Sequence, residues 1–305
     1  MNRILITGAL GQIGTLLCQS LSNDPDNFIL ATDIRKPIKN TQYDFVQADV
    51  LDYKFFVKLV TEHRINTIYH LVSILSANGE HDPFGTWNLN IQSFQNIVRL
   101  GKEYKIKRIF WPSSIAVYGK DISPILAPQQ TEMNPETIYG ITKLAGEKLM
   151  NYYKIKYGLD IRSIRLPGVI SINAAGGGTT DFAVEMLNCA LNKDKYTCYL
   201  LPNTRLPMIY IEDAINAIKA LMKTNFKNNE RIYSYNVMGY SLTPKIWADA
   251  IINKGYKLEV DYKPDYRQII ADGWPQTVDD KLANSIWGWA PKYNIEKTLS
   301  DILKS

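Results

Sequence analysis

The fold is decided by the segment Arg3-Ile4-Leu5-Ile6-Thr7-Gly8-Ala9-Leu10-Gly11-Gln12-Ile13-Gly14. Its apolar start is typical of a buried parallel strand, and residues 15–21 have the apolar spacing of a helix. Glycines between a strand and a helix let the backbone turn sharply and approach a pyrophosphate at the helix N-terminus. The spacing Gly-x-x-Gly-x-x-Gly departs from the usual Gly-x-Gly-x-x-Gly fingerprint, so on its own it also fits a plain turn between core elements.

A second apolar run, residues 28–32, ends in Asp33, 19 residues after Gly14. A carboxylate at this distance binds the adenosine ribose hydroxyls and repels the extra phosphate of NADP. NAD is therefore the expected cofactor, and NADP stays an alternative because Arg35 and Lys36 follow closely. Two further runs, one ending at residues 49–50 and one spanning 68–72, predict a third and a fourth strand.

The composition excludes several classes of protein. The 305 residues are 46% hydrophobic and 21% charged, enough for a full core, and the net charge of +5 is spread without an arginine-aromatic stripe that would indicate nucleic acid. The three cysteines and three histidines lack metal-ligand spacing, so no metal is expected. We find no apolar run of 18 residues and no leader sequence, which favours a cytoplasmic protein without a membrane partner.

Tyr139 and Lys143 form the candidate catalytic pair. Residues four apart share a helix face, and the apolar pattern predicts a helix over residues 139–157. We expect the lysine ammonium to lower the pKa of the tyrosine and so produce a general base for an alcohol proton.

Spacing alone does not select this pair, because Tyr152 with Lys156 and Tyr293 with Lys297 also match Tyr-x-x-x-Lys. The run at residues 108–114 predicts a strand whose C-terminal end carries Ser114, 25 residues before Tyr139. A hydroxyl there can bind the same substrate oxygen, which favours Tyr139 and leaves the other two tyrosines as packing residues.

These motifs together resemble the extended short-chain dehydrogenase/reductase family. The matching residues are the glycine turn, Asp33, Asp49-Val50, residues 70–73, Ser113-Ser114 followed by Val117-Tyr118-Gly119, and Tyr139-x-x-x-Lys143. The resemblance implies an α/β fold: a Rossmann-type doubly wound parallel sheet with a smaller interleaved α/β substrate-binding lobe. It places the NAD-binding domain at residues 1–166 with a return segment at about 207–235, and the lobe at about 167–206 and 236–305.

The resemblance also assigns roles. Tyr139 is the acid/base, Lys143 also holds the nicotinamide ribose, and Ser114 orients the substrate oxygen. The implied cofactor contacts are Gly8, Gly11, Gln12, Ile13, Gly14, Asp33, Ile34, Asp49, Val50, Leu71, Val72, Ser73, Tyr139, Lys143 and Leu166.

Four segments, residues 73–80, 176–185, 205–210 and 272–275, are similar to the short-chain type of L-threonine 3-dehydrogenases. That similarity implies NAD-dependent oxidation of the C3 hydroxyl of L-threonine to 2-amino-3-oxobutyrate. The implied substrate contacts are Ser76, Ser114, Tyr139, Thr179, Thr180, Asp181 and Trp274, with Asp181 as ammonium partner or organiser of its loop. Residues 179–181 also fit a helix cap, Trp274 also fits ordinary core, and glycines 176–178 fit either a flexible loop or a lid hinge.

Several alternatives stay open. Arg205, Arg231 and Arg267 would suit the diphosphate of a nucleotide-sugar epimerase or dehydratase. A paralogue acting on another 3-hydroxy amino acid, and a non-enzymatic NAD sensor, use the same fold. The resemblance also implies a homodimer that pairs helices at residues 84–104 and 139–157, although the same apolar faces suit the monomer core.

Overall fold

The computed structural model describes residues 1–172, 176–226 and 234–303. Its strands are β1 (Asn2–Thr7), β2 (Asn27–Asp33), β3 (Asp44–Gln47), β4 (Thr67–His70), β5 (Arg108–Phe110), β6 (Ser113–Ser114), β7 (Ile161–Leu166), β8 (Gly168–Ile170), β9 (Lys195–Cys198), β10 (Leu206–Tyr210), β11 (Ser234–Asn236), β12 (Tyr240–Leu242) and β13 (Glu259–Tyr262). Its helices are α1 (Gln12–Ser22), α2 (Tyr53–Glu62), α3 (Ser76–Gly79), α4 (Pro83–Trp87), the π-helical turn η1 (Asn88–Gln92), α5 (Ser93–Glu103), the 3-10 turn η2 (Ile115–Val117), α6 (Ile138–Tyr157), α7 (Phe182–Asn192), α8 (Ile211–Lys223), α9 (Pro244–Asn253), α10 (Tyr266–Asp272), α11 (Lys281–Trp287) and α12 (Ile295–Ile302).

One large parallel sheet organises the first part of the chain. Its strand order is β11-β7-β5-β4-β1-β2-β3, with β6 paired beside β7. The order runs outward in both directions from β1 and β4, so the chain reverses its winding between these two strands. Ligands of doubly wound sheets bind at the carboxyl ends of the strands at this reversal. The predicted Rossmann-type sheet is confirmed, and it places the glycine turn after β1 at that point.

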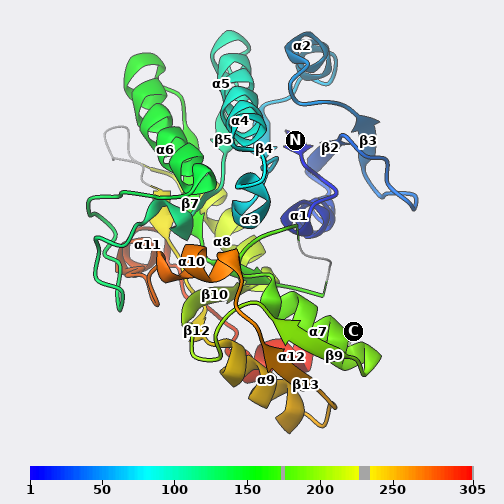
Figure 1. Ribbon diagram of the computed structural model, residues 1–305. Helices are drawn as coiled ribbons and strands as arrows, with labels where there is room; N and C mark the ends of the chain where they lie inside the picture. Colours follow the sequence, from blue (N-terminus) through cyan, green and yellow to red (C-terminus); the bar gives the residue numbers. More distant parts are fainter. Residues whose placement is uncertain (173–175, 227–233, 304–305) are drawn as a thin grey trace.

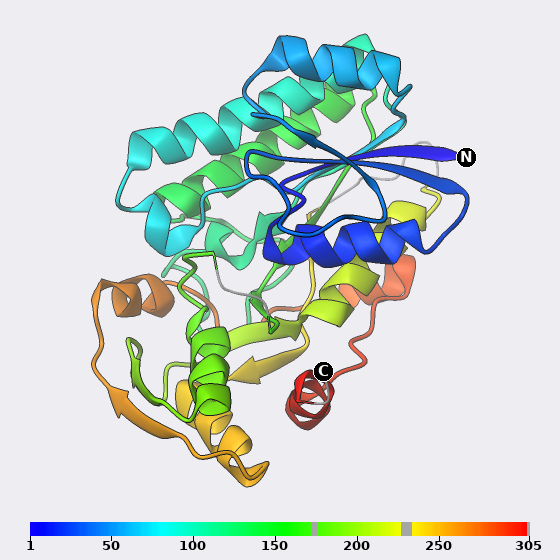
Figure 2. The same cartoon turned by 90° about the vertical axis from the view of Figure 1, so that its right-hand side faces the viewer.

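Helices cover both faces of this sheet, as a parallel sheet requires. Helices α5 and α6 pack on one face, whereas α1 and α8 pack together on the other (Figure 2). Strand residues such as Leu5, Ile6 and Leu30 have no exposed surface, which makes the sheet the centre of the core. Thr137 is the N-cap residue of α6, and its hydroxyl accepts a hydrogen bond from the Gly140 amide at 3.1 Å.

Two small sheets lie below the large one in Figure 1, together with α7, α9 and α12. One has the order β12-β10-β8, and the other pairs β13 with β9. Helix α10 belongs to the same part of the chain and contacts α3 beside the large sheet (Figure 1). Loops and strands from distant parts of the sequence thus face the glycine turn from below.

Two predicted elements are interrupted. The strand expected at residues 108–114 breaks into β5 and β6 at Trp111-Pro112, because proline lacks the amide that a ladder needs. The helix expected at residues 84–104 contains the π-helical turn η1. No helix in the described part of the chain is long and apolar enough to cross a membrane.

Candidate active site

The glycine turn between β1 and α1 is shaped for close backbone approach. Gly8 has φ of +71°, a left-handed conformation that glycine adopts without strain. A Cβ atom on Gly14 would lie 2.3 Å from the Gly8 carbonyl oxygen, so no side chain fits there. Gly14 thus lets α1 pack closely on the turn, and the start of α1 lines a cavity in which helix N-terminal amides suit a pyrophosphate.

Asp33 ends β2 beside this turn and is buried. Its Oδ2 accepts a hydrogen bond from the Leu10 amide at 3.0 Å, and its Oδ1 accepts from the Arg35 amide and Nε. The carboxylate thus holds the glycine turn and the start of the next loop together. Arg35 itself is largely exposed and lies at the rim of the site.

Two adjoining cavities follow the carboxyl ends of the strands. The first has a volume of about 640 Å³ and the second about 270 Å³, and both include Gly8, Gly11 and Ser73 in their walls. All fifteen predicted cofactor residues line one or both: Gly8, Gly11, Gln12, Ile13, Gly14, Leu71, Ser73, Tyr139, Lys143 and Leu166 line the first, and Asp33, Ile34, Asp49, Val50 and Val72 line the second. The glycine cradle, the acid and the volume therefore fit a dinucleotide.

Tyr139, Lys143 and Ser114 meet at one wall of the first cavity. Tyr139 and Lys143 lie one turn apart on α6, and Ser114 ends β6. The Lys143 Nζ donates a hydrogen bond to the Pro112 carbonyl at 2.9 Å and lies 5.4 Å from the centroid of the Tyr139 ring. The structure thus brings the three predicted catalytic residues together.

The expected lowering of the Tyr139 pKa is wrong. Burial raises the pKa of Tyr139 to about 12, although a hydrogen bond with Ser114 opposes the change. Burial also lowers the pKa of Lys143 to about 7, because the ammonium has lost its water. Sequence spacing could not reveal how deeply both groups are buried.

The opposite wall holds the predicted substrate residues Ser76, Thr180 and Asp181. Thr179 is fully buried behind that wall, where its hydroxyl lies 3.0 Å from the Ser76 Oγ. The Thr179 amide donates to the same Ser76 oxygen at 3.1 Å. This pair joins α3 to the loop before α7.

Asp181 organises the glycine loop, which is one of the two roles that the sequence predicts for it. Its Oδ2 accepts hydrogen bonds from the amides of Gly177 at 2.9 Å and Gly178 at 2.6 Å. Although Asp181 occupies the N-cap position of α7, its side chain does not cap the helix. Burial raises the pKa of this carboxyl to about 6, and the two amides oppose the rise.

Trp274 also lines the first cavity and is buried. The competing Tyr-x-x-x-Lys pairs lie elsewhere: Tyr152 is half exposed among other tyrosines, and the Tyr293 ring packs against Tyr210 at an interplanar angle of 57°. No described group of three His, Cys, Asp or Glu side chains is placed to hold a metal ion.

The arginines that would suit a diphosphate do not line these two cavities as far as the structure describes them. This holds for Arg205 and Arg267. Arg267 pairs with Asp265 and stacks on Tyr199, and its charge opposes the rise in the pKa of Asp181 that burial causes. Arg231 lies outside the described residues.

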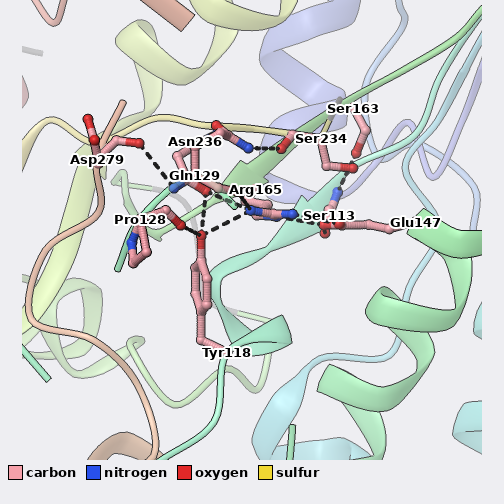
Figure 3. Close-up of polar contacts among 10 residues, drawn as sticks. All are labelled: Ser113, Tyr118, Pro128, Gln129, Glu147, Ser163, Arg165, Ser234, Asn236 and Asp279. Atoms are coloured by element: carbon pink, nitrogen blue, oxygen red, sulfur yellow. Dashed lines mark hydrogen bonds and ion pairs between the residues drawn. The ribbon is translucent and has the colours of Figure 1, made fainter. Parts of the chain in front are cut away.

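Sequence reasoning missed a buried polar network around Arg165 that includes Ser113, the residue before Ser114 (Figure 3). Arg165 binds Glu147 through two hydrogen bonds of 2.8 Å, and Ser113 donates to Glu147 at 2.6 Å. The second amino group of Arg165 donates to the Tyr118 hydroxyl and to the Gln129 carbonyl. The network links α6, β6 and β7 to residues 118–129. Glu147 follows Lys143 by four residues, a spacing that could have indicated its face of the helix.

The comparisons with known proteins agree with this geometry. Residues 4–237 match the model of the NAD dependent epimerase/dehydratase family. The chain belongs to this family. An uncharacterized epimerase/dehydratase of Staphylococcus saprophyticus is 39% identical, over 97% of this chain and 94% of that protein. The family fixes the cofactor as NAD, and the cavities above supply the residues that would hold it.

Two solved structures narrow the likeness within the epimerase/dehydratase family. The holo form of a GalE-like L-threonine dehydrogenase from Cupriavidus necator superposes with a TM-score of 0.94, with 38% identity over 99% of both chains. A monomeric L-threonine 3-dehydrogenase from a metagenome gives a TM-score of 0.92, with 40% identity over 99% of this chain and 98% of that one.

Proposed function

We propose that this protein oxidises the C3 hydroxyl of L-threonine to 2-amino-3-oxobutyrate and reduces NAD to NADH. The observation that carries the proposal is the cavity that joins Tyr139, Lys143 and Ser114 to the Ser76 and Asp181 wall. The likeness to solved L-threonine dehydrogenases extends over nearly the whole chain and supports the same substrate.

The chemical step assigns one task to each residue. Tyr139 removes the hydroxyl proton while the hydride leaves C3, and bound NAD supplies the hydride acceptor. Ser114 orients the alcohol oxygen and, through its hydrogen bond, lowers the pKa of Tyr139. When Lys143 carries its proton, its charge stabilises the phenolate that forms.

The opposite wall positions the amino acid. A zwitterion needs acceptors for its ammonium group and donors for its carboxylate. Asp181 supplies a carboxylate, and the hydroxyls of Ser76 and Thr180 supply both donors and acceptors at the cavity surface. Thr179 is buried outside the cavity lining, and its hydroxyl and amide contact the Ser76 hydroxyl and hold it in place. Trp274 contacts the apolar end of the substrate.

The test is the near-ultraviolet absorbance of NADH formed from L-threonine and NAD by the purified protein. The proposal expects reduced cofactor to accumulate in step with loss of threonine. A nucleotide-sugar epimerase keeps its hydride within the catalytic cycle, so it accumulates no NADH. Conversion of a nucleotide sugar with no accumulation of NADH would therefore indicate an epimerase or dehydratase in place of the proposed dehydrogenase. NADH formed from another 3-hydroxy amino acid, and not from L-threonine, would indicate a paralogue.

We also propose that two copies pair through α4, α5 and α6. The exposed apolar side chains on these helices support this: Phe84 is 89% exposed and Ile155 is 87% exposed, with Trp87, Ile141 and Tyr152 about half exposed. One similar dehydrogenase is described as monomeric, so the oligomeric state requires its own measurement. Light scattering should give twice the chain mass.

Two further expectations remain proposals. The division into residues 1–166 with a return segment, and a substrate lobe from the rest, is supported by the separate small sheets. A cytoplasmic location is supported by the thiols of Cys18, Cys189 and Cys198, which are all free.

A further inference from the structure

A third cavity shares Trp274 with the cavity that holds the proposed substrate site. Its volume is about 260 Å³, and its lining includes Tyr118, Thr137, Ile269 and Ile270 as well as Trp274. It is formed between α10 and the start of α6, two elements that belong to different parts of the fold (Figure 1). Of the residues in its wall, only Trp274 also lines the first cavity.

Trp274 is fixed in this position by its neighbours. Its amide donates to the Ala271 carbonyl at 3.1 Å directly after α10 ends, and Pro275 restricts the residue before it. The helix is tied to the first part of the chain because the Tyr266 hydroxyl lies 3.1 Å from His81 Nε2. These contacts hold the backbone that carries the indole, and Trp274 forms the wall that both cavities share.

The chemistry of the two cavities differs across this wall. The reacting groups Ser114 and Tyr139 line the first cavity together with Trp274, so a substrate that reacts at Tyr139 shares this cavity with the indole. Glu80 and Glu136 are part of the lining of the third cavity, and Ile269, Ile270 and Tyr118 supply its apolar part. An apolar substituent on C3 would find a matching space there, whereas the ammonium and carboxylate groups stay at Asp181 and Ser76.

We propose that Trp274 limits the C3 substituent of the substrate to the size of a methyl group, and that the third cavity is an extension of the substrate site from which Trp274 excludes larger groups. The inference rests on the proposed function and names the class that an opened site accepts: 3-hydroxy amino acids with an aryl or branched alkyl group on C3. The reaction balances as it does for threonine. The C3 hydride passes to NAD, the hydroxyl proton passes to Tyr139, and a 2-amino-3-oxo acid and NADH form.

The test compares L-threo-3-phenylserine with L-threonine as substrates of the full-length protein with NAD. Trp274→Ala should raise the ratio of kcat/KM for phenylserine over threonine at least about tenfold, the scale on which one apolar group in a pocket discriminates. Trp274→Leu is the milder variant and should raise the same ratio by less. It carries the test if the alanine variant does not fold, as judged by NAD binding.

Two controls separate removal of the wall from a general loosening. Ile269→Ala enlarges the third cavity at its exposed rim and leaves Trp274 in place, so the ratio should stay at the wild-type value. Ile270→Phe added to Trp274→Ala refills the third cavity and should return the ratio toward wild type. An unchanged ratio in folded Trp274 variants, or a gain that survives Ile270→Phe, overturns the inference. Wild-type turnover of threonine reports on the proposed function separately.

Discussion

Replacing Lys143 by methionine should stabilise the folded protein at neutral pH while it abolishes turnover. Burial lowers the pKa of Lys143 from 10.5 to about 7. The folded state therefore binds fewer protons than the unfolded state between these pH values, and its stability rises with pH across that window. At pH 7 the charged form of this lysine costs the native state about 4 kcal/mol, because each tenfold change in a protonation equilibrium is worth about 1.36 kcal/mol.

Methionine fills a similar volume without charge, but it leaves the Pro112 carbonyl without its donor, at a cost of about 1 kcal/mol. The variant should thus gain about 3 kcal/mol at pH 7. At pH 9.5 the lysine is mostly neutral in the folded state and only about 1 kcal/mol of the penalty remains, so the gain in the free energy of unfolding should fall to near zero.

The assay is urea unfolding followed by tryptophan fluorescence, at one protein concentration and without NAD. Lys148→Met is the matched control, because Lys148 is exposed on the same helix, and it should change the free energy of unfolding by less than about 0.5 kcal/mol. A Lys143→Met variant that is less stable than wild type at pH 7, or equally stabilised at both pH values, would refute the reasoning.

Three other changes have defined outcomes. Tyr139→Phe should lower kcat by roughly 10²–10⁴-fold while the Kd for NAD, measured by calorimetry, stays near wild type. Because burial raises the pKa of Tyr139 to about 12, the rate of wild-type oxidation should rise with pH above neutrality, by as much as about tenfold per pH unit. A rate that does not change with pH would contradict this. Asp33→Ala should weaken NAD binding and narrow the preference for NAD over NADP in initial rates, whereas an unchanged preference would mean that Asp33 does not face the ribose. Glu147→Ala leaves the buried Arg165 unpaired and should lower the free energy of unfolding, measured in urea, by about 3–5 kcal/mol. The control Glu62→Ala removes an exposed ion pair and should lower it by at most about 1 kcal/mol. Equal losses in the two variants would contradict the role of the network.

The sequence predicts those parts of the site that depend on local spacing. The strand, glycine turn and helix at residues 3–21 are contiguous, so periodicity and glycine positions suffice to place them. Tyr139 and Lys143 share a face because they are four residues apart on one helix. To place Ser114, a further argument was needed: strand ends meet at one edge of the sheet. The structure places Ser114 in the same cavity lining as Tyr139.

Contacts between distant segments leave no such signal. Arg165 and Glu147 lie on a strand and a helix whose packing is set by the whole fold, so their pairing could not be read from spacing. The N-cap position of Asp181 suggests capping, but its carboxylate turns back to the glycine amides instead. The pKa of Tyr139 moved opposite to expectation because burial, a tertiary property, outweighs the effect of one neighbouring residue.

The most direct test of the central claim is the fate of the hydrogen on C3 of L-threonine. Threonine deuterated at C3 should give NADH that carries the deuterium, together with slower turnover if hydride transfer limits the rate. Mass spectrometry of the reduced cofactor measures this in one experiment, with Tyr139→Phe as the inactive control. Singly deuterated reduced cofactor from wild type is the predicted result. Reduced cofactor without deuterium, or none at all, would contradict the account.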